Sequence, residues 1–371
     1  MYTIRLLIST LLTMIWFWVN GAMASASTVI LPEPRGVYGV GTTNIELSDV
    51  TRRHLRNSDK RRWMATVFYP SHKAQALHPY MPGTLEDGFV CGVKVLAHAE
   101  LNSPPIISEK FPVIIALPGR GGERQQETIL YEALASHGYI IITMDQPYVA
   151  NFVKLADDTK ITLTFKDAWK LSRDRDYRYQ YDNDVIHDAI QDIDYLLQNF
   201  DRFGDLARAF DRNKIILMGH SLGGNVAHIK GFSDKRIMAV VDIDSKITER
   251  KVFGRIGVPP NPDAKPVLFV RGNMQYQEDV GDQLTIISNS TIWSPDVQHS
   301  AFSDKAYFAA KIPHYGMRFF QSFYNWFFKR GPYFSSVDTS LGEYKVDQWF
   351  LEYPTRVILW LDKYAKNSLR R

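Results

Sequence analysis

"IILMGHSLGGNVAHIKG", Ile215 to Gly231, joins an apolar run to a helix pattern through a glycine-rich turn. The apolar run is typical of a buried strand, and we expect the helix that follows, Ser221 to Lys230, to end at Gly231. Ser221 has a glycine two residues away on each side. Glycines at this spacing let neighbouring backbone pass close to a serine on a sharp strand-to-helix turn. The spacing therefore predicts a nucleophile; the alternative is a small residue in an ordinary tight turn.

The rest of the chain repeats this alternation of short β-branched runs and longer amphipathic segments. Such alternation indicates a parallel sheet covered by helices on both faces, and no Pro/Gly/Ser linker divides the chain, so we expect one α/β domain. Two further helices are expected at Glu127 to His137 and Asn183 to Asn199. The expected strands are Met64 to Tyr69, Val113 to Leu117, Tyr139 to Met144, Lys214 to Met218, Ile237 to Ile243, Pro266 to Arg271 and Thr285 to Trp293.

Residues 1–24 have the anatomy of a secretory signal peptide. Arg5 precedes an apolar run from Leu6 to Val19, and an Ala-x-Ala pattern follows at Ala22 and Ala24. This run of 14 residues is shorter than the ~20 that span a bilayer, which favours cleavage over an uncleaved anchor. We therefore expect an exported protein, periplasmic or secreted, whose domain occupies residues 25–371. Cys91 is the only cysteine, so no intrachain disulfide can form.

Composition excludes little except a nucleic-acid partner. The 371 residues are 45% hydrophobic and 23% charged, with a net charge of only +4, which is ordinary for a globular enzyme and gives no electrostatic case for nucleic acid. A polar, aromatic and weakly periodic stretch, about 151–182, is expected to be an inserted loop region that overhangs a site. One basic run is interpreted as a solvated loop beside a strand, with an anionic surface as the alternative partner. This run consists of Arg52, Arg53, Arg56, Lys60, Arg61 and Arg62.

A serine hydroxyl is a poor nucleophile until a base takes its proton, and the base needs a carboxylate to orient it. When the serine lies on a turn of this kind, the chain order is serine, acid, histidine. Of the ten histidines, His299 and His314 follow the last expected strand. His299 comes a few residues after that strand and before a helix pattern, so we assign it as the base.

The acid is sought at the carboxyl end of a strand, where the sites of parallel sheets collect. Asp244 stands at such an end, in "AVVDIDSKI", whereas Asp242 falls inside the apolar alternation and is typical of a buried structural carboxylate. We therefore choose Asp244. Other acidic residues follow the next strand, though none closely: Glu278, Asp279 and Asp282.

Attack on an ester carbonyl creates an oxyanion that needs preorganised N–H donors. One expected donor is the amide of Leu222, the residue after the serine. The second is expected from the loop "ALPGRGGERQQ", whose glycines let amides point inward, and the amide of Arg120 is our candidate. The side chain of Arg120 points either at solvent or at an acidic group of the substrate.

With these residues the chain resembles the platelet-activating factor acetylhydrolases of the plasma and intracellular type II group, and their bacterial relatives, within the α/β-hydrolases. The likeness covers about residues 36–310 and includes "WMATVFYP", "FPVIIALPGRGG", "LASHGYIIITMDQP", "GHSLGG", "VDID", "KPVLFVRG" and "HSAFSD". It implies an α/β-hydrolase fold with a mostly parallel central sheet and helices on both faces. It also implies Ser221 as nucleophile, Asp244 as orienting acid, His299 as base, and the amides of Arg120 and Leu222 as oxyanion donors.

The chain departs from the family's pattern in two places. Leu117-Pro118-Gly119 stands where a family member often has Ser-His-Gly, and the stretch between Arg271 and Thr285 is short and polar where the family has a helix. Beyond the likeness, an aromatic helical region is expected at about 315–366. Its first part, "YGMRFFQSFYNWFFKRGPYF", is interpreted as a helix packed on the sheet, with a peripheral membrane contact as the alternative.

Together these features predict an exported serine esterase acting on a carboxylic ester with a short or oxidised acyl chain, such as the sn-2 chain of a phospholipid. The partner is then an ester or lipid small molecule, and no metal or organic cofactor is implied. Two alternatives stay open: other acyl chemistry on the same residues (a general lipase, a polyester or dienelactone-type hydrolase, or an acyltransferase), and a non-catalytic binding protein. The sequence does not indicate an oligomeric state.

Overall fold

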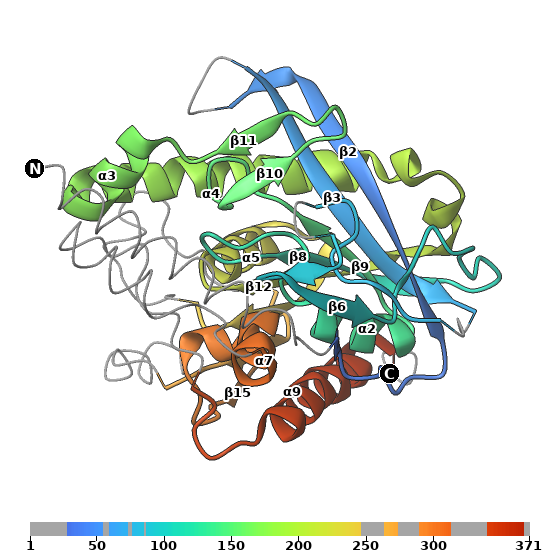
Figure 1. Ribbon diagram of the computed structural model, residues 1–371. Helices are drawn as coiled ribbons and strands as arrows, with labels where there is room; N and C mark the ends of the chain where they lie inside the picture. The colour runs from blue at the N-terminus through green and yellow to red at the C-terminus, as the bar shows by residue number, and fades with distance from the viewer. Residues whose placement is uncertain are drawn as a thin grey trace, which may run out of the picture.

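The computed structural model describes residues 28–54, 59–72, 76–84, 87–245, 263–273, 289–312 and 340–366. In this part of the chain the largest sheet has the strand order β15-β14-β13-β12-β8-β9-β3-β2-β7 (Figure 1). Neighbouring strands from β15 to β9 are parallel, whereas β3 is antiparallel to both β9 and β2. The sheet is therefore mixed, with its parallel part where the sequence predicts parallel strands and a long antiparallel hairpin beside it.

The strands of this sheet are β2 (Gly39–Arg53), β3 (Lys60–Ser71), β7 (Glu100–Leu101), β8 (Phe111–Leu117), β9 (Ile140–Met144), β12 (Phe210–His220), β13 (Ile237–Ile243), β14 (Val267–Val270) and β15 (Ser290–Trp293). Smaller sheets contain β1 (Val29–Ile30), β4 (His78–Pro79), β5 (Phe89–Val90) and β6 (Val93–Ala97), and β10 (Phe152–Lys154) with β11 (Lys160–Thr162). The α-helices are α2 (Thr128–Ser136), α3 (Phe165–Arg173), α4 (Arg175–Gln198), α5 (Leu222–Ser233), α7 (Asp304–Lys311) and α9 (Val346–Leu361). Shorter helical turns are η1 (Phe200–Ala209), η3 (His299–Phe302) and η5 (Asp362–Lys366).

The parallel strands are apolar on both faces because helices cover both. In β8, Ile114 belongs to one buried cluster and its neighbour Ile115 to the other, as the two-residue period of a strand requires. Helices α4 and α5 pack on the face of Ile115, and α2, α7 and α9 pack on the face of Ile114 (Figure 1). The predicted arrangement, with helices on both faces, is the observed one.

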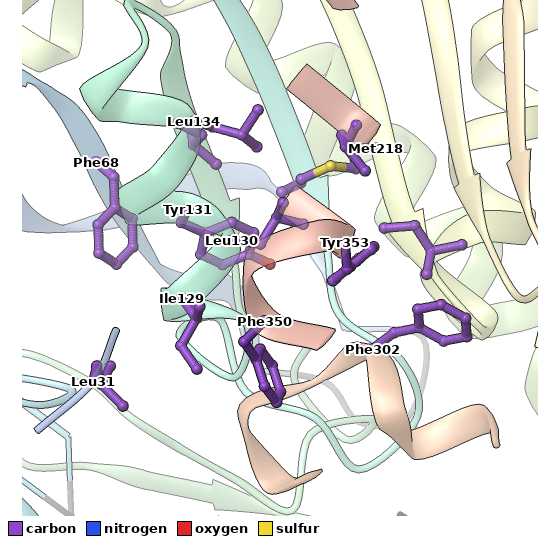
Figure 2. Close-up of a cluster of buried hydrophobic side chains, with 14 of the residues drawn as sticks. Leu31, Phe68, Ile129, Leu130, Tyr131, Leu134, Met218, Phe302, Phe350 and Tyr353 are labelled. Atoms are coloured by element: carbon purple, nitrogen blue, oxygen red, sulfur yellow. The ribbon is translucent and has the colours of Figure 1, made fainter. Parts of the chain in front are cut away.

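Figure 2 shows the cluster under α2 and α9, which supports the loop after β15. Tyr131 of α2, Met218 of β12, Phe302 of η3 and Tyr353 of α9 are each at most 1% exposed. Full burial of side chains of this size contributes about 1.5–3 kcal/mol each. The cluster therefore fixes η3, which begins at His299, against the sheet.

Two sequence expectations differ from the structure around α4. The stretch at about 151–182, expected as a loop, contains the β10–β11 hairpin, α3 and the first turns of α4. Helix α4 begins at Arg175 rather than near Asn183, because the side chain of Asp174 caps it by accepting a hydrogen bond from the Tyr177 amide at 2.9 Å. The charged first turns of α4 hide the apolar period that marks the rest of the helix.

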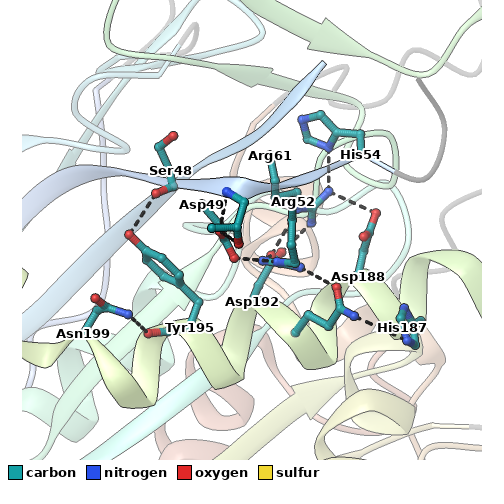
Figure 3. Close-up of polar contacts among 12 residues, drawn as sticks. Ser48, Asp49, Arg52, His54, Arg61, His187, Asp188, Asp192, Tyr195 and Asn199 are labelled. Atoms are coloured by element: carbon teal, nitrogen blue, oxygen red, sulfur yellow. Dashed lines mark hydrogen bonds and ion pairs between the residues drawn. The ribbon is translucent and has the colours of Figure 1, made fainter. Parts of the chain in front are cut away.

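The basic run is not a solvated loop where Arg52 and Arg61 lie, and Arg56 lies outside the described residues. Arg61 lies in β3 and is 1% exposed, and its guanidinium forms ion pairs with Asp188 and Asp192 of α4 (Figure 3). Arg52 of β2 also reaches Asp192, at 2.7 Å. These arginines therefore attach α4 to the β2–β3 hairpin, because each side of the contact brings the opposite charge.

Helix α5 does not end at Gly231 but continues to Ser233. A Cβ atom on Gly231 would lie 2.4 Å from Cγ2 of Val240, so glycine here allows the helix to approach β13 rather than marking its end. Among the described helices, none is long and apolar enough to cross a membrane. The expected signal peptide and the aromatic stretch 315–334 lie outside the described residues.

Candidate functional site

Ser221 lies on the turn between β12 and α5, in a conformation that costs energy for a residue with a side chain. Its φ and ψ are 52° and −117°, and backbone angles of this kind cost about 1–3 kcal/mol and persist where the surroundings hold them. Here the Ser221 amide donates a hydrogen bond to the carbonyl oxygen of Ile243 at 2.8 Å. The neighbouring strand β13 therefore stabilises the strained turn, and the serine is half-buried at the carboxyl end of β12.

The two glycines around the serine have no room for a side chain. A Cβ atom on Gly219 would lie 2.2 Å from the backbone of Gly223, and one on Gly223 would lie 2.1 Å from the carbonyl oxygen of Leu117. Atoms this close would force the backbone of the turn apart. The spacing of the motif is thus a steric requirement of the turn.

Asp244 and His299, assigned as acid and base from the sequence, are brought together by the structure. Oδ2 of Asp244 lies 2.6 Å from Nδ1 of His299. Asp244 follows β13 with a φ of 51°, and its other oxygen accepts a hydrogen bond from the Gly272 amide at 2.9 Å. A carboxylate so held fixes the ring of His299 and places the ring's proton on Nδ1.

This arrangement leaves Nε2 of His299 as the basic nitrogen. Burial alone would raise the pKa of Asp244, but the hydrogen bonds and charge of His299 and the Gly272 amide outweigh it, so the pKa lies below its usual value. The carboxylate therefore stays ionised and stabilises a positive charge on His299. Within the described residues, no hydrogen bond joins Ser221 Oγ to His299; catalytic hydrogen bonds are often long without substrate and tighten in the complex.

The loop that carries His299 is anchored by residues to which the sequence analysis gave no role. Nε1 of Trp349, in α9, donates to the carbonyl oxygen of Ala301 at 2.8 Å. The carboxyl group of Asp304 accepts hydrogen bonds from the backbone amides of Thr128 and Ile129, at 2.8 and 3.2 Å. It thereby caps the start of α2. The only sequence signal for Asp304 was its place in "HSAFSD".

The glycine-rich loop after β8 lies against the serine turn. A Cβ atom on Gly119 would lie 3.1 Å from Cβ of Ser221, which places Arg120, the next residue, at the same corner. Leu222 is the first residue of α5, so its amide has no acceptor within the helix. The guanidinium of Arg120 forms an ion pair with Asp182 of α4, so it joins this loop to the segment at 151–182.

Asp242, the acid set aside in the sequence analysis, is fully buried away from His299. It accepts hydrogen bonds from Oγ of Ser245 at 2.7 Å and Nη1 of Arg271 at 3.1 Å, and Nδ1 of His228 lies 3.3 Å from it. It thereby ties together the ends of β13 and β14 that flank Asp244. The remaining candidates, Glu278, Asp279, Asp282 and His314, lie outside the described residues.

In the described part of the chain, no group of three or more His, Cys, Asp or Glu side chains is arranged to hold a metal ion. The chemistry this corner of the sheet can supply is that of a strained serine, an oriented imidazole and two nearby amides.

Comparisons with known proteins point to esterases. The chain is 25% identical over 262 residues to a probable 1-alkyl-2-acetylglycerophosphocholine esterase of Arthroderma benhamiae, a match that spans 62% of this chain and 63% of the relative's length. It is similar in structure to a ferulic acid esterase from Streptomyces cinnamoneus, with a TM-score of 0.68 and 21% identity, over 93% of this chain and 96% of the esterase. The chain therefore shares the fold of that esterase. No family model matches the sequence.

Proposed function

We propose that this protein is a serine esterase of the α/β-hydrolase fold that cleaves carboxylic esters through an acyl-enzyme on Ser221. The observation that carries the proposal is the 2.6 Å hydrogen bond between Asp244 and His299, at the edge of the sheet where Ser221 holds a strained turn. The fold shared with a ferulic acid esterase supports it. A binding protein would need neither the strain nor the oriented histidine.

In the proposed reaction Nε2 of His299 takes the proton of Ser221 Oγ as the oxygen attacks the ester carbonyl carbon. The resulting oxyanion accepts hydrogen bonds from the amides of Arg120 and Leu222. The carbon–oxygen bond to the alcohol then breaks, and His299 gives its proton to the leaving alcohol. Water repeats the sequence on the acyl-enzyme, which releases the acid and restores Ser221.

For the substrate, we propose an ester with a short or oxidised acyl chain, of the kind found at the sn-2 position of a phospholipid. The family resemblance and the relative named as a probable 1-alkyl-2-acetylglycerophosphocholine esterase support this choice. Hydrolysis of p-nitrophenyl esters of graded chain length, beside a phospholipid with an acetyl group at sn-2, tests it. Activity confined to long chains would contradict it, and preference for polyesters, lactones or an acceptor alcohol would favour the other acyl chemistries.

We further propose that residues 1–24 direct export and are removed, so that the enzyme acts in the periplasm or medium. N-terminal sequencing of the mature protein tests this proposal. A mature chain that retains residues 1–24 would contradict it.

Labelling with a fluorophosphonate probe tests the enzyme proposal itself, because the probe reacts with activated serines. We expect one label on Ser221 in the folded protein and none in Ser221→Ala, with circular dichroism confirming that the variant folds. Failure to label, or labelling that survives the substitution, would overturn the proposal. His299→Ala should abolish hydrolysis while His314→Ala retains it; the reverse result would reassign the base.

A further inference from the structure

A second histidine lies directly behind the expected base. His220 is the last residue of β12 and is 6% exposed, and its ring centroid lies 4.5 Å from that of His299. Nε2 of His220 is 3.0 Å from the backbone carbonyl oxygen of His299. Because a carbonyl oxygen only accepts hydrogen bonds, Nε2 of His220 carries a proton. His220 therefore holds the backbone of the residue whose side chain acts as base.

The other ring nitrogen of His220 faces a carboxyl group. Burial, and then the charge of His299, lower the pKa of His220 to about 3, so its ring is neutral and Nδ1 is an unprotonated acceptor. Nδ1 is buried and has no hydrogen-bond partner among the described residues. The nearest oxygen of Glu127, a residue 2% exposed, lies 4.0 Å from it. A donor from Glu127 would complete the hydrogen bonds of the ring.

Only a protonated Glu127 offers that donor. An ionised carboxylate would instead set a negative charge against the lone pair of Nδ1. Among the described residues no lysine or arginine forms an ion pair with Glu127. Asp304, Tyr131 and Tyr353 interact with it electrostatically, and Gln126 donates a hydrogen bond to it at 3.4 Å. The nearby cation Lys305, in α7, acts on the ring of His220 and lowers its pKa. Burial raises the pKa of Glu127 to about 8, against the smaller effect of Gln126. The site therefore favours the neutral acid near pH 7.

We propose that Glu127, as a neutral carboxylic acid, and His220 form a pair that positions the base of the esterase. The acid O–H donates to Nδ1 of His220, which keeps Nε2–H of the same ring on the carbonyl of His299. From the observed 4.0 Å the oxygen and nitrogen must approach by about 1 Å for a normal hydrogen bond. The inference rests on the proposed function, and both members are positioning residues that do not touch substrate.

The pair has a consequence for the pH dependence of the reaction. Below about pH 8 Glu127 is protonated and the hydrogen bond to His220 is present. As the pH rises through that value the acid ionises, the hydrogen bond is lost, and a negative charge appears beside the ring that supports His299. We therefore expect kcat to fall on the alkaline side, through a group that is not the base.

The pH profile of kcat for Glu127→Gln is the first test. A glutamine amide can donate to Nδ1 of His220 but cannot ionise, so the alkaline fall should disappear while kcat at pH 7 drops by no more than about threefold. Glu132→Gln is the matched control, because Glu132 is equally buried in α2, the helix that begins directly after Glu127, and instead accepts hydrogen bonds from the amides of His98 and Ala99. Its profile should keep the alkaline fall. A Glu127→Gln profile that matches the wild type would overturn the proposal.

Substitution of His220 is the second test. His220→Phe removes the donor to His299 and should lower kcat by about 10²-fold with KM within about twofold. His220→Gln supplies an amide donor and should recover at least tenfold of that loss. Equal kcat values for the Phe and Gln variants, with both folded by circular dichroism, would contradict the positioning role.

Infrared spectroscopy tests the pair without activity. At pH 7 the difference spectrum between wild type and Glu127→Gln should contain the C=O stretch of one protonated carboxyl group, and the band should vanish as the wild type is brought above about pH 9. The absence of that band would overturn the pair even in an active enzyme. A wild type that shows the band but hydrolyses no ester would overturn the proposed function and leave the pair standing.

Discussion

Two buried polar networks lie on opposite faces of the central sheet. One contains ion pairs, whereas the other contains buried carboxyl groups without ion pairs among the described residues. On the face covered by α4, Arg61 is ion-paired with Asp188 and Asp192 and also hydrogen-bonds Nδ1 of His54 at 2.7 Å (Figure 3). On the face covered by α2, Glu127 and Asp304 are equally buried, yet no lysine or arginine of the described residues forms an ion pair with either.

The two networks differ in the group that neutralises the buried carboxyl groups. Beside Arg61 a guanidinium does so, and burial together with the charge of Arg61 lowers the pKa of His54 to about 4, so that the ring accepts rather than repels. Under the loop that carries His299 a proton does so for Glu127, because burial raises the pKa of that carboxyl group to about 8. Burial also raises the pKa of Asp304, whose carboxyl group accepts hydrogen bonds from two amides and from Tyr80. The first network therefore holds over a wide pH range, whereas the second depends on pH.

Breaking the ionised network should have the largest effect on stability. Arg61→Leu leaves Asp188 and Asp192 buried with less positive charge, and loss of one partner from a buried ion pair typically costs about 3–5 kcal/mol. Urea denaturation should show this decrease in the free energy of unfolding. A loss below about 1 kcal/mol would mean that the network contributes little and that apolar packing alone holds α4.

Protonation of Glu127 should make the stability of the protein depend on pH. Because the folded-state pKa of Glu127 is raised from 4.5 to about 8, its contribution is fully present below about pH 4.5 and is lost as the pH rises through about 8. Each pKa unit corresponds to about 1.4 kcal/mol, so between pH 5 and pH 9 Glu127→Gln should gain about 2–4 kcal/mol relative to the wild type. Urea denaturation at both pH values gives this difference; parallel pH curves for the two proteins would contradict the assignment.

Loss of the hydrogen bond that anchors the loop of His299 should have an intermediate effect on stability. Trp349→Phe leaves the carbonyl oxygen of Ala301 without its donor, which typically costs about 1–3 kcal/mol, and should lower kcat several-fold because η3 is released. Trp360→Phe is the matched control on the same helix, because Nε1 of Trp360 is buried without a partner in the described structure. Thermal unfolding and kcat of both variants check this; equal kcat values would show that the hydrogen bond does not position His299.

The smallest effect on stability is expected at Arg62, the residue that follows Arg61 in the chain. Arg62, the neighbour of Arg61, pairs with Glu46 at 2.6 Å and with Asp157 at 2.9 Å, but its side chain is 31% exposed. Ion pairs open to solvent are typically worth about 0–1 kcal/mol. Arg62→Gln should therefore change the free energy of unfolding by less than about 1 kcal/mol in the same urea titration. A loss like that of Arg61→Leu would mean that burial is not what separates the two arginines.

Local patterns account for much of this structure. The parallel strands β8, β9, β12, β13 and β14 contain short apolar runs between turns, and the expected segments overlap all five of them. The turn at Ser221 carries its own steric requirement in the flanking glycines, and Asp244 could be chosen over Asp242 by its place at a strand end. These features are readable because each depends on neighbours within a few residues.

What the sequence did not reveal depends on contacts between distant residues. Strand β2 was not expected, because its residues are largely polar and most of them are only partly buried. The burial of Arg61 depends on acids more than 120 positions away in the chain. Glu127, His220 and Asp304 come from three separate segments, and no spacing in the sequence marks them as neighbours.

We propose that ester cleavage passes through an acyl group on Ser221. Rapid mixing with p-nitrophenyl acetate, followed by acid quench and mass spectrometry, measures this directly. We expect a burst of p-nitrophenol close to the enzyme concentration, an acetyl group on the peptide that contains Ser221, and neither in Ser221→Ala. Acetylation of another residue, or turnover that persists in folded Ser221→Ala, would contradict it.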